Sequence, residues 1–411
     1  MSLIAQRAAQ PDDERPAPGT QQQTVPSPPA IPAQPAPAPV DRARPAHRTG
    51  SRVFAIDLLR FFCALAVVAY HLIWDDKGTW GTNSGQLFTT GVQVVAKYGW
   101  VGVECFFVIS GFVICMSSWG RSVADFFISR VVRLMPAYLF AVLVTAAVLT
   151  LWPLADGRPQ PTHVLYHLTF LHPFLGIPDF DTVYWTLFIE LKFYLLFTIV
   201  VHFGLTYRRV VLFCVLWTVA SLYAQFAGPW VFFVIVEPRF TNYFVAGITL
   251  YLMYRYGPNL LLWCMLGTSM ILSLFFLNGQ VEPFNTGRHI MSFPVAALIT
   301  LGFFLLMTAV ALGWLSWLRW RGLMVLGALT YPLYLMHAQL SRVIIFHFHR
   351  SVQPVLLLCL LVVGVLVLAY LVHRLVERPV ARYLRNGLRS SFARIRAADL
   401  ADPPVRRRSG D

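Results

Sequence analysis

The chain has 411 residues, of which 57% are hydrophobic and only 13% carry a charged side chain. Soluble globular proteins contain about 25% charged residues, so this composition excludes a soluble enzyme and indicates a polytopic membrane protein. The net charge of +14 does not indicate nucleic-acid binding, because the arginines concentrate in the two tails and in alternate loops, as expected for a protein oriented by the positive-inside rule. We therefore predict an all-α fold in a lipid bilayer, with no nucleic-acid partner.

The two ends of the chain differ in composition from the segment between them. Residues 1–50 are rich in Pro, Ala and Gln and contain too little apolar surface to form a core, which predicts a disordered cytoplasmic tail. Residues 379–411 are rich in arginine and are predicted to form a basic cytoplasmic tail. Residues 51–378 then form one membrane domain.

Ten apolar segments of this domain are long enough to cross a hydrocarbon core of about 30 Å. With both termini in the cytoplasm, the arginine-rich loops fall on the inner side. The segment 163–176 is expected to be an interfacial or re-entrant stretch, since an eleventh span would turn the later arginine-rich loops outward. The predicted spans are 53–74, 99–119, 134–152, 184–203, 210–227, 240–256, 259–277, 292–313, 323–345 and 353–374.

The first span carries two polar residues, Arg60 and His71. Eleven helical residues make three turns plus about 20°, so both side chains lie on one helix face, about 16 Å apart along the axis. Ionisable groups cost roughly 2.5–3.5 kcal/mol in the middle of a spanning helix, and they usually face a cavity or a partner. This pattern favours an interior polar site. The alternatives are a snorkelling role for Arg60 and a packing role for His71.

Further carboxylates and imidazoles lie toward the predicted outer side of the spans. Glu104 and Glu190 each lie about six residues, or roughly 9 Å, from the outer end of their span. His337 lies in the outer half of the ninth span, just beyond a kink expected at Pro332. We expect these groups to contribute to the same site as His71.

A polar stripe is predicted on the fourth span. Thr186, Glu190 and Tyr194 recur at positions i, i+4 and i+8, which lie on one face of a helix. Glu190 therefore has polar neighbours on an otherwise apolar helix.

Arg130 and Arg133 lie three residues apart at the predicted inner mouth of the third span. They are explained either by the positive-inside rule alone or by a phosphate-binding role, since arginine pairs offer forked donors to phosphate oxygens. If the second reading fails, the remaining candidates for a phosphate site are Arg255, Arg319 and Arg321.

Six motifs in order resemble the membrane acyltransferase-3 family, whose members transfer acyl groups onto carbohydrates and other acceptors in bacterial membranes. The resemblance covers roughly residues 53–380. The motifs are Asp57-Leu-Leu-Arg60 with His71, the segments 102–112, 130–136 and 184–190 with Phe193-Tyr194, and the segments 239–247 and 331–337.

The resemblance implies site roles as well as an activity. His71 is implied as the catalytic residue together with Arg60, and Arg130 and Arg133 match a family-typical arginine pair. The implied donor is acyl-CoA, with acetyl-CoA expected, and no metal is expected. The acceptor is expected to be a hydroxyl of a carbohydrate or glycoconjugate of the cell envelope, and the location is the bacterial inner membrane. Some relatives carry a fused SGNH-type domain, and this chain is expected to act without one.

Chemical alternatives stay open at this stage. His71 can act as a general base, with Glu190 or Glu104 orienting its imidazole, or it can form an acyl-histidine. His337 and Tyr194 are expected to support either route. A proton-coupled transporter would also bury His, Glu and Arg in spanning helices. A non-catalytic scaffold is disfavoured because so many buried ionisable groups are costly.

Overall fold

The computed structural model describes residues 53–75, 78–81, 84–154, 157–170, 172–282 and 291–401. The tail predicted at residues 1–50 lies outside these ranges. Within the described residues the regular structure is helical, and no strand beyond an isolated bridge occurs. Nine of the described helices are long and apolar enough to cross a membrane, and the bent pair α13 and α14 raises the number to ten if it is one span. The predicted all-α polytopic fold is therefore confirmed.

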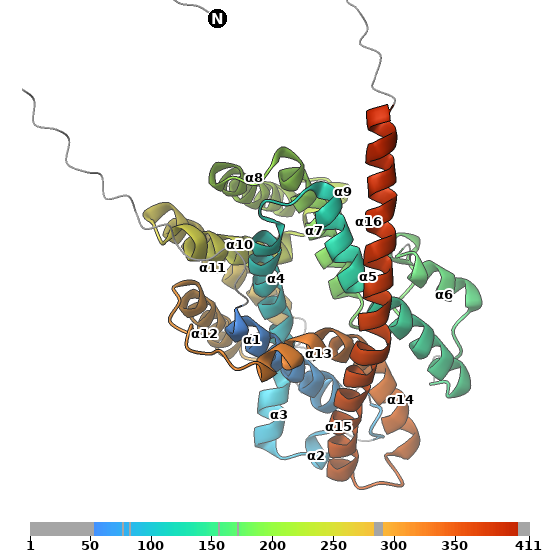
Figure 1. Ribbon diagram of the computed structural model, residues 1–411. Coiled ribbons are helices and arrows are strands. Elements are labelled where there is room, and N and C mark those ends of the chain that lie inside the picture. Colours follow the sequence, from blue (N-terminus) through green and yellow to red (C-terminus); the bar gives the residue numbers. More distant parts are fainter. Residues whose placement is uncertain are drawn as a thin grey trace, which may run out of the picture. The chain divides into compact units, whose positions relative to one another are not determined.

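Figure 1 shows the arrangement of these helices. In chain order they are α1 Phe54–Ala69, η1 Tyr70–Trp74, α2 Ser84–Leu87, α3 Thr90–Lys97, η2 Gly99–Val101, α4 Gly102–Ser118, α5 Val123–Leu151, α6 Pro161–Leu168, η3 His172–Leu175, α7 Trp185–Phe203, α8 Tyr207–Phe226, α9 Trp230–Val236, α10 Pro238–Tyr256, α11 Leu260–Val281, α12 Phe293–Ala311, α13 Gly322–Met336, α14 Ala338–Phe348, α15 Pro354–Val372, η5 His373–Glu377 and α16 Arg378–Ala401.

Helix α5 begins well before the span predicted at 134–152. The hydroxyl of Ser122 accepts a hydrogen bond from the backbone N–H of Asp125 at 3.1 Å, which satisfies one of the free donors at a helix start. Hydropathy detects only the apolar part of this helix, because the polar first turns do not contribute to a membrane signal. Arg130 and Arg133 consequently lie on a helix, not in the loop that precedes it.

The segment 163–176 forms two short helices, α6 and η3, outside the helices that are long enough to span a membrane. The bend of the ninth span differs from the prediction. Pro332 lies inside the continuous helix α13, and the chain bends by 58° at His337, between α13 and α14. Just beyond the bend, the N–H of Gln339 in the first turn of α14 donates to the carboxylate of Asp181 at 2.9 Å, which satisfies one of the free donors at a helix start.

Helices α4 and α10 pack at very close range through two glycines. A Cβ on Gly247 would lie 1.9 Å from the carbonyl oxygen of Val108, and a Cβ on Gly111 would lie 2.2 Å from the carbonyl oxygen of Phe244. Small residues allow backbones to approach in this way, and close packing is a main source of helix association in membranes. The α4 wall of the site described below is held in place by this contact.

We expect Gly247→Ala to destabilise the protein by about 1–3 kcal/mol or more, because the added methyl group must push two helix backbones apart. The control is Gly267→Ala on α11, where a Cβ meets nothing within 4 Å and the substitution favours helix by about 0.5–1 kcal/mol. Thermal unfolding in detergent measures both variants. Equal melting temperatures for the two would contradict the close-packing argument.

Candidate active site

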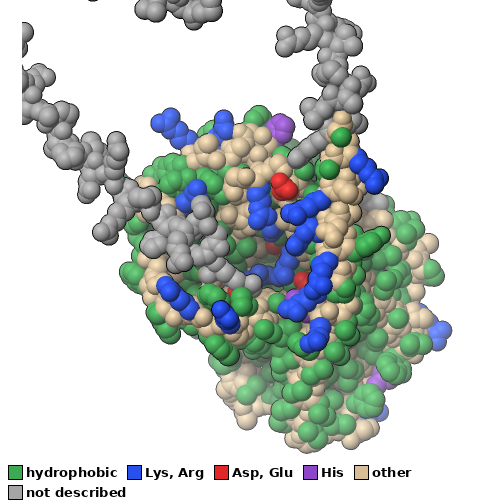
Figure 2. All heavy atoms as spheres, in the orientation of Figure 1, with side chains coloured by type: hydrophobic (Ala, Val, Ile, Leu, Met, Phe, Trp, Pro, Cys, Tyr) green, Lys and Arg blue, Asp and Glu red, His purple; other side chains and the backbone are tan. Residues whose placement is uncertain are grey.

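A cavity of about 370 Å³ opens between α1, α4, α5, α7, α13 and the α16 end of the bundle. We call it the arginine cavity, because its lining includes Arg60, Arg130, Arg133, Arg378 and Arg385. Figure 2 shows Lys and Arg side chains gathered around a hollow on this face of the molecule. The cavity brings together five of the predicted site residues from three helices, namely Arg60, Arg130, Arg133, Glu190 and Tyr194.

Glu190 is the acidic centre of this cavity. Its Oε1 accepts hydrogen bonds from the hydroxyls of Ser110, at 2.8 Å, and Tyr194, at 2.5 Å. Within the polar stripe on α7, Tyr194 therefore helps to hold the carboxylate of Glu190. Arg60 lines the same cavity. The negative charge of Glu190 therefore offsets part of the free-energy cost of burying the Arg60 guanidinium.

The two arginines of α5 are held differently. Arg130 donates to the hydroxyls of Ser117 and Ser129, each at 3.2 Å, and its guanidinium lies 5.6 Å from the ring centroid of Tyr194. Arg133 forms an ion pair with Glu377 at 3.2 Å. Arg130 therefore has no carboxylate partner among the described residues, which suits the binding of an external anion.

A smaller cavity of about 60 Å³ continues from the first. Both are lined by Arg60, Ser110, Glu190 and Tyr331, and the smaller one extends to Thr186 and Tyr334. We call it the tyrosine cavity. Thr186 Oγ1 lies 3.0 Å from the hydroxyl of Tyr334. A polar path therefore leads from the arginine cavity into the bundle.

Two imidazoles lie beyond Tyr334. His71 lies in the π-helical turn η1 and is 15% exposed, and its ring centroid is 5.3 Å from that of the fully buried His337. The ring of Tyr334 is 5.8 Å from His337. A π-helical turn inside a helix often marks a functional site, because it redirects side chains at a cost in regular hydrogen bonding. Two of the candidate site residues, His71 and His337, therefore lie side by side.

The tautomer of His337 follows from its contacts. Its Nδ1 lies 2.8 Å from the carbonyl oxygen of Tyr334, and a carbonyl can only accept, so Nδ1 carries the proton. Its Nε2 is buried and has no hydrogen-bond partner among the described residues. A neutral His337 thus presents an unused acceptor beside His71.

Asp181 belongs to this group, although the sequence analysis did not select it. Its carboxylate is buried and accepts backbone hydrogen bonds from Gln339 and Val183 at 2.9 and 3.2 Å. Burial raises the pKa of Asp181 to about 6, while the charges of His71 and Arg342 act in the opposite direction. The available signal was a pair of acids, Asp179 and Asp181, shortly before the predicted span 184–203.

Glu104 is not brought to this site. It is 3% exposed, its Oε2 has no hydrogen-bond partner among the described residues, and it lines neither cavity. The alternative phosphate-site residues also lie elsewhere. Arg255 packs over Trp119 at 4.6 Å, and Arg319 donates to the carbonyl of Ser316. Of the arginines that the sequence singled out, only Arg60, Arg130 and Arg133 line the arginine cavity.

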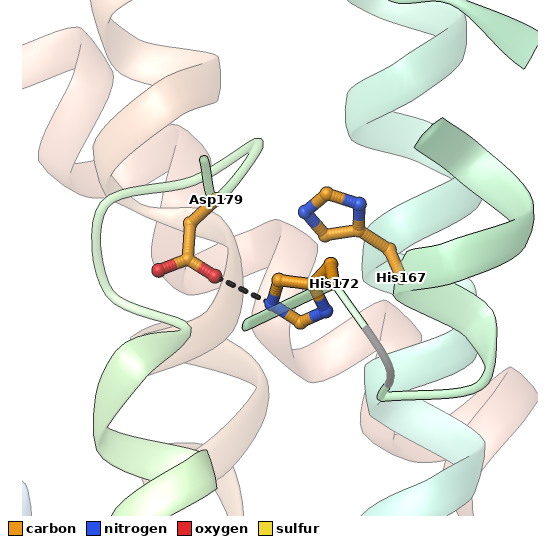
Figure 3. Close-up of side chains that lie close together, drawn as sticks. All are labelled: His167, His172 and Asp179. Atoms are coloured by element: carbon orange, nitrogen blue, oxygen red, sulfur yellow. Dashed lines mark hydrogen bonds and ion pairs between the residues drawn. The ribbon is translucent and has the colours of Figure 1, made fainter. Parts of the chain in front are cut away.

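A second cluster, His167, His172 and Asp179, lies in the connection before α7 (Figure 3). His172 Nε2 contacts Asp179 at 2.7 Å, and the two imidazoles stack face to face at 4.0 Å with an interplanar angle of 11°. Metal ligands must point their ring nitrogens at one centre, and parallel stacked rings do not converge in this way.

The neighbours of His167 explain the cluster structurally. Its Nδ1 bonds the carbonyl of His163 at 2.8 Å, and its Nε2 accepts the N–H of Phe180 at 3.2 Å. Burial lowers the pKa of His167, which favours this neutral form. The cluster therefore orders the chain just ahead of Asp181.

The sequence of this chain matches a family model described as an acyltransferase domain over residues 53–374. It is also 29% identical over 189 residues to Nodulation protein 10 from Rhizobium leguminosarum bv. viciae. That match covers 40% of this chain and 48% of the relative, so the chain spans about half the length of the relative. No solved structure matches the chain significantly.

Proposed function

Because the chain belongs to the membrane acyltransferase-3 family, we propose that it transfers an acetyl group from acetyl-CoA to a hydroxyl of a carbohydrate or glycoconjugate. The observation that carries the proposal is the polar path from the arginine cavity, past Glu190, to Tyr334 and the two imidazoles. A donor with an anionic nucleotide and a long neutral arm fits such a path, because its charge and its reactive carbonyl are far apart.

The nucleotide of the donor is assigned to the arginine cavity. Guanidinium groups bind phosphate oxygens through forked hydrogen bonds. The axial separation of about 16 Å between Arg60 and His71 on one helix leaves room for the pantetheine arm. In the cell, this arrangement requires the arginine cavity to face the cytoplasm of a bacterial inner membrane, with both chain termini on that side.

The reaction then takes place at the imidazoles. The acceptor oxygen attacks the thioester carbonyl carbon, the base His71 takes the hydroxyl proton, and the C–S bond breaks to release the thiolate of CoA, which takes up a proton. Asp181 and the unused Nε2 of His337 lie beside this base. A negative carboxylate stabilises the imidazolium that forms as the proton is transferred.

The direct test is donor turnover by purified protein in nanodiscs with acetyl-CoA labelled in the acetyl group. We expect thiol release that depends on a carbohydrate acceptor, and label on that acceptor. A folded protein that neither binds CoA nor releases thiol with any acceptor would contradict the proposal. Proton-coupled uptake of solute into liposomes by the same preparation would instead favour a transporter.

Arg133→Lys tests the donor assignment. We expect the KM for acetyl-CoA to rise about tenfold, since a charge-assisted hydrogen bond contributes about 1.5–3 kcal/mol and lysine lacks the fork, while the acceptor KM stays unchanged. The control is Arg319→Lys, an exposed arginine outside the cavity. Cysteine accessibility of both termini confirms unchanged orientation. Donor saturation identical to wild type in Arg133→Lys would return the α5 arginines to a purely topological role.

A further inference from the structure

One wall of the arginine cavity is built by η5 and α16. Arg378, Ala381 and Arg385 line the cavity from α16. Seven helical residues make two turns less about 20°, so Arg378 and Arg385 share one face and lie about 10 Å apart along the axis. The small side chain of Ala381 lies between them. Figures 1 and 2 show α16 running beside α5, with basic side chains along the edge of the hollow.

The charged side chains that line this cavity do not balance one another. Its lining holds five arginines and two glutamates, Glu190 and Glu377, which leaves three positive charges in excess. Glu377 is already engaged by Arg133 and by His373 Nδ1, at 3.2 and 2.6 Å. A ligand with several negative charges would complete the balance, because uncompensated like charges in a shared cavity repel each other.

Arg385 is an exposed arginine that is free to bind an external anion. Arg378 has its Nε 3.1 Å from His373 Nε2, whereas Arg385, like Arg60, makes no hydrogen bond or ion pair within the part of the chain that the structure describes. Both side chains are exposed, while Arg60, Arg130 and Arg133 are half-buried. The exposure of the arginines thus increases from Arg60, Arg130 and Arg133 inside the cavity to Arg378 and Arg385 at its rim.

We propose that Arg378 and Arg385 bind the ribose 3′-phosphate of the acyl donor. This assignment rests on the proposed function. Coenzyme A carries its thiol at one end, a diphosphate in the middle and the 3′-phosphate at the nucleotide end. With the thioester directed toward Tyr334, the diphosphate meets the half-buried arginines and the 3′-phosphate meets the rim. The α16 helix is then part of the donor site, and the rim arginines distinguish CoA from donors that lack this phosphate.

The test compares binding of CoA and 3′-dephospho-CoA to full-length protein in nanodiscs by calorimetry. In Arg378→Gln/Arg385→Gln, we expect the Kd for CoA to rise about tenfold or more, since charged hydrogen bonds are lost, and the Kd for 3′-dephospho-CoA to change less than about twofold. The single variant Arg385→Gln is expected to show the same selectivity with a smaller loss. It has no described contact to break, so it stays informative if the double variant folds poorly.

The matched control is Arg382→Gln/Arg389→Gln, which removes the same charge from exposed arginines of α16 that do not line the cavity. If both double variants weakened CoA binding equally, the loss would come from the overall positive charge of α16 and not from Arg378 and Arg385. This result would overturn the proposal. Equal loss for the two nucleotides would overturn the 3′-phosphate assignment. Unchanged CoA binding, or a loss only in binding to phosphatidylglycerol vesicles, would also overturn it. Failure of wild-type protein to bind either nucleotide would instead remove the proposed function.

Discussion

His71→Gln lowers acyl transfer about 10²–10⁴-fold, the usual cost of losing a general base, while the Kd for CoA stays at the wild-type value. We expect the transfer rate to fall without a change in the Kd for CoA, because His71 lies beyond Tyr334 and does not line the arginine cavity. Glutamine keeps a polar side chain of similar length in the π-helical turn. Transfer rates at saturating donor and calorimetric Kd values measure the two quantities.

The matched control is His347→Gln on α14, where the imidazole is exposed and bonds only the carbonyl of Val343 among the described residues. This control is expected to keep wild-type transfer. A well-folded His71→Gln protein that retained more than half of the wild-type rate would exclude His71 as the base. Mass spectrometry of wild-type protein trapped with acetyl-CoA alone distinguishes direct attack from an acyl-histidine, which would add an acetyl group to the peptide containing His71.

Asp181→Asn lowers transfer about tenfold at pH 7 and removes a pH dependence near 6. The pKa of Asp181 is raised to about 6 by burial, so in wild-type protein the carboxylate becomes neutral as the pH falls through that value. The imidazolium formed on His71 then loses a stabilising anion. A loss of about 1.4 kcal/mol in the stability of this imidazolium corresponds to a tenfold lower transfer rate. We therefore expect wild-type transfer to fall below pH 6 with a component that Asp181→Asn lacks.

The same shift has the opposite sign in folding. A carboxyl whose pKa is higher in the folded state binds more protons there than in the unfolded chain between about pH 4 and 6, so its contribution to stability falls as the pH rises through this window. Unfolding curves at several pH values should show this component in wild type and not in Asp181→Asn. The control is Asp179→Asn, which removes the partner of His172 in the same connection. If Asp179→Asn alone abolished the inflection near pH 6, Asp181 would not be the titrating group.

The membrane class, the spanning helices and the candidate site residues could be read from the sequence. Hydropathy is a sum of transfer free energies of single residues, so it identifies spanning helices without information on which residues contact each other in the fold. The shared face of Arg60 and His71, and the stripe that includes Glu190 and Tyr194, follow from the helical repeat alone. The tertiary structure places Arg60, Glu190, Arg130 and Arg133 around one cavity, although depth estimates did not predict which of them would meet.

Other features were decided only by the packing of helices against each other. Glu104 on α4 lines neither cavity, and the rotation of a helix about its axis, which decides such lining, leaves hydropathy and depth unchanged. The bend lies at His337, where Asp181, distant in sequence, accepts the N–H of Gln339 at the start of α14, and not at Pro332, which lies inside α13. Arg385 joins the site because α16 continues as a helix past the apolar span and lies against α5. Each of these features is a contact between segments far apart in the chain, and such contacts depend on interhelical geometry that single-residue free energies do not contain.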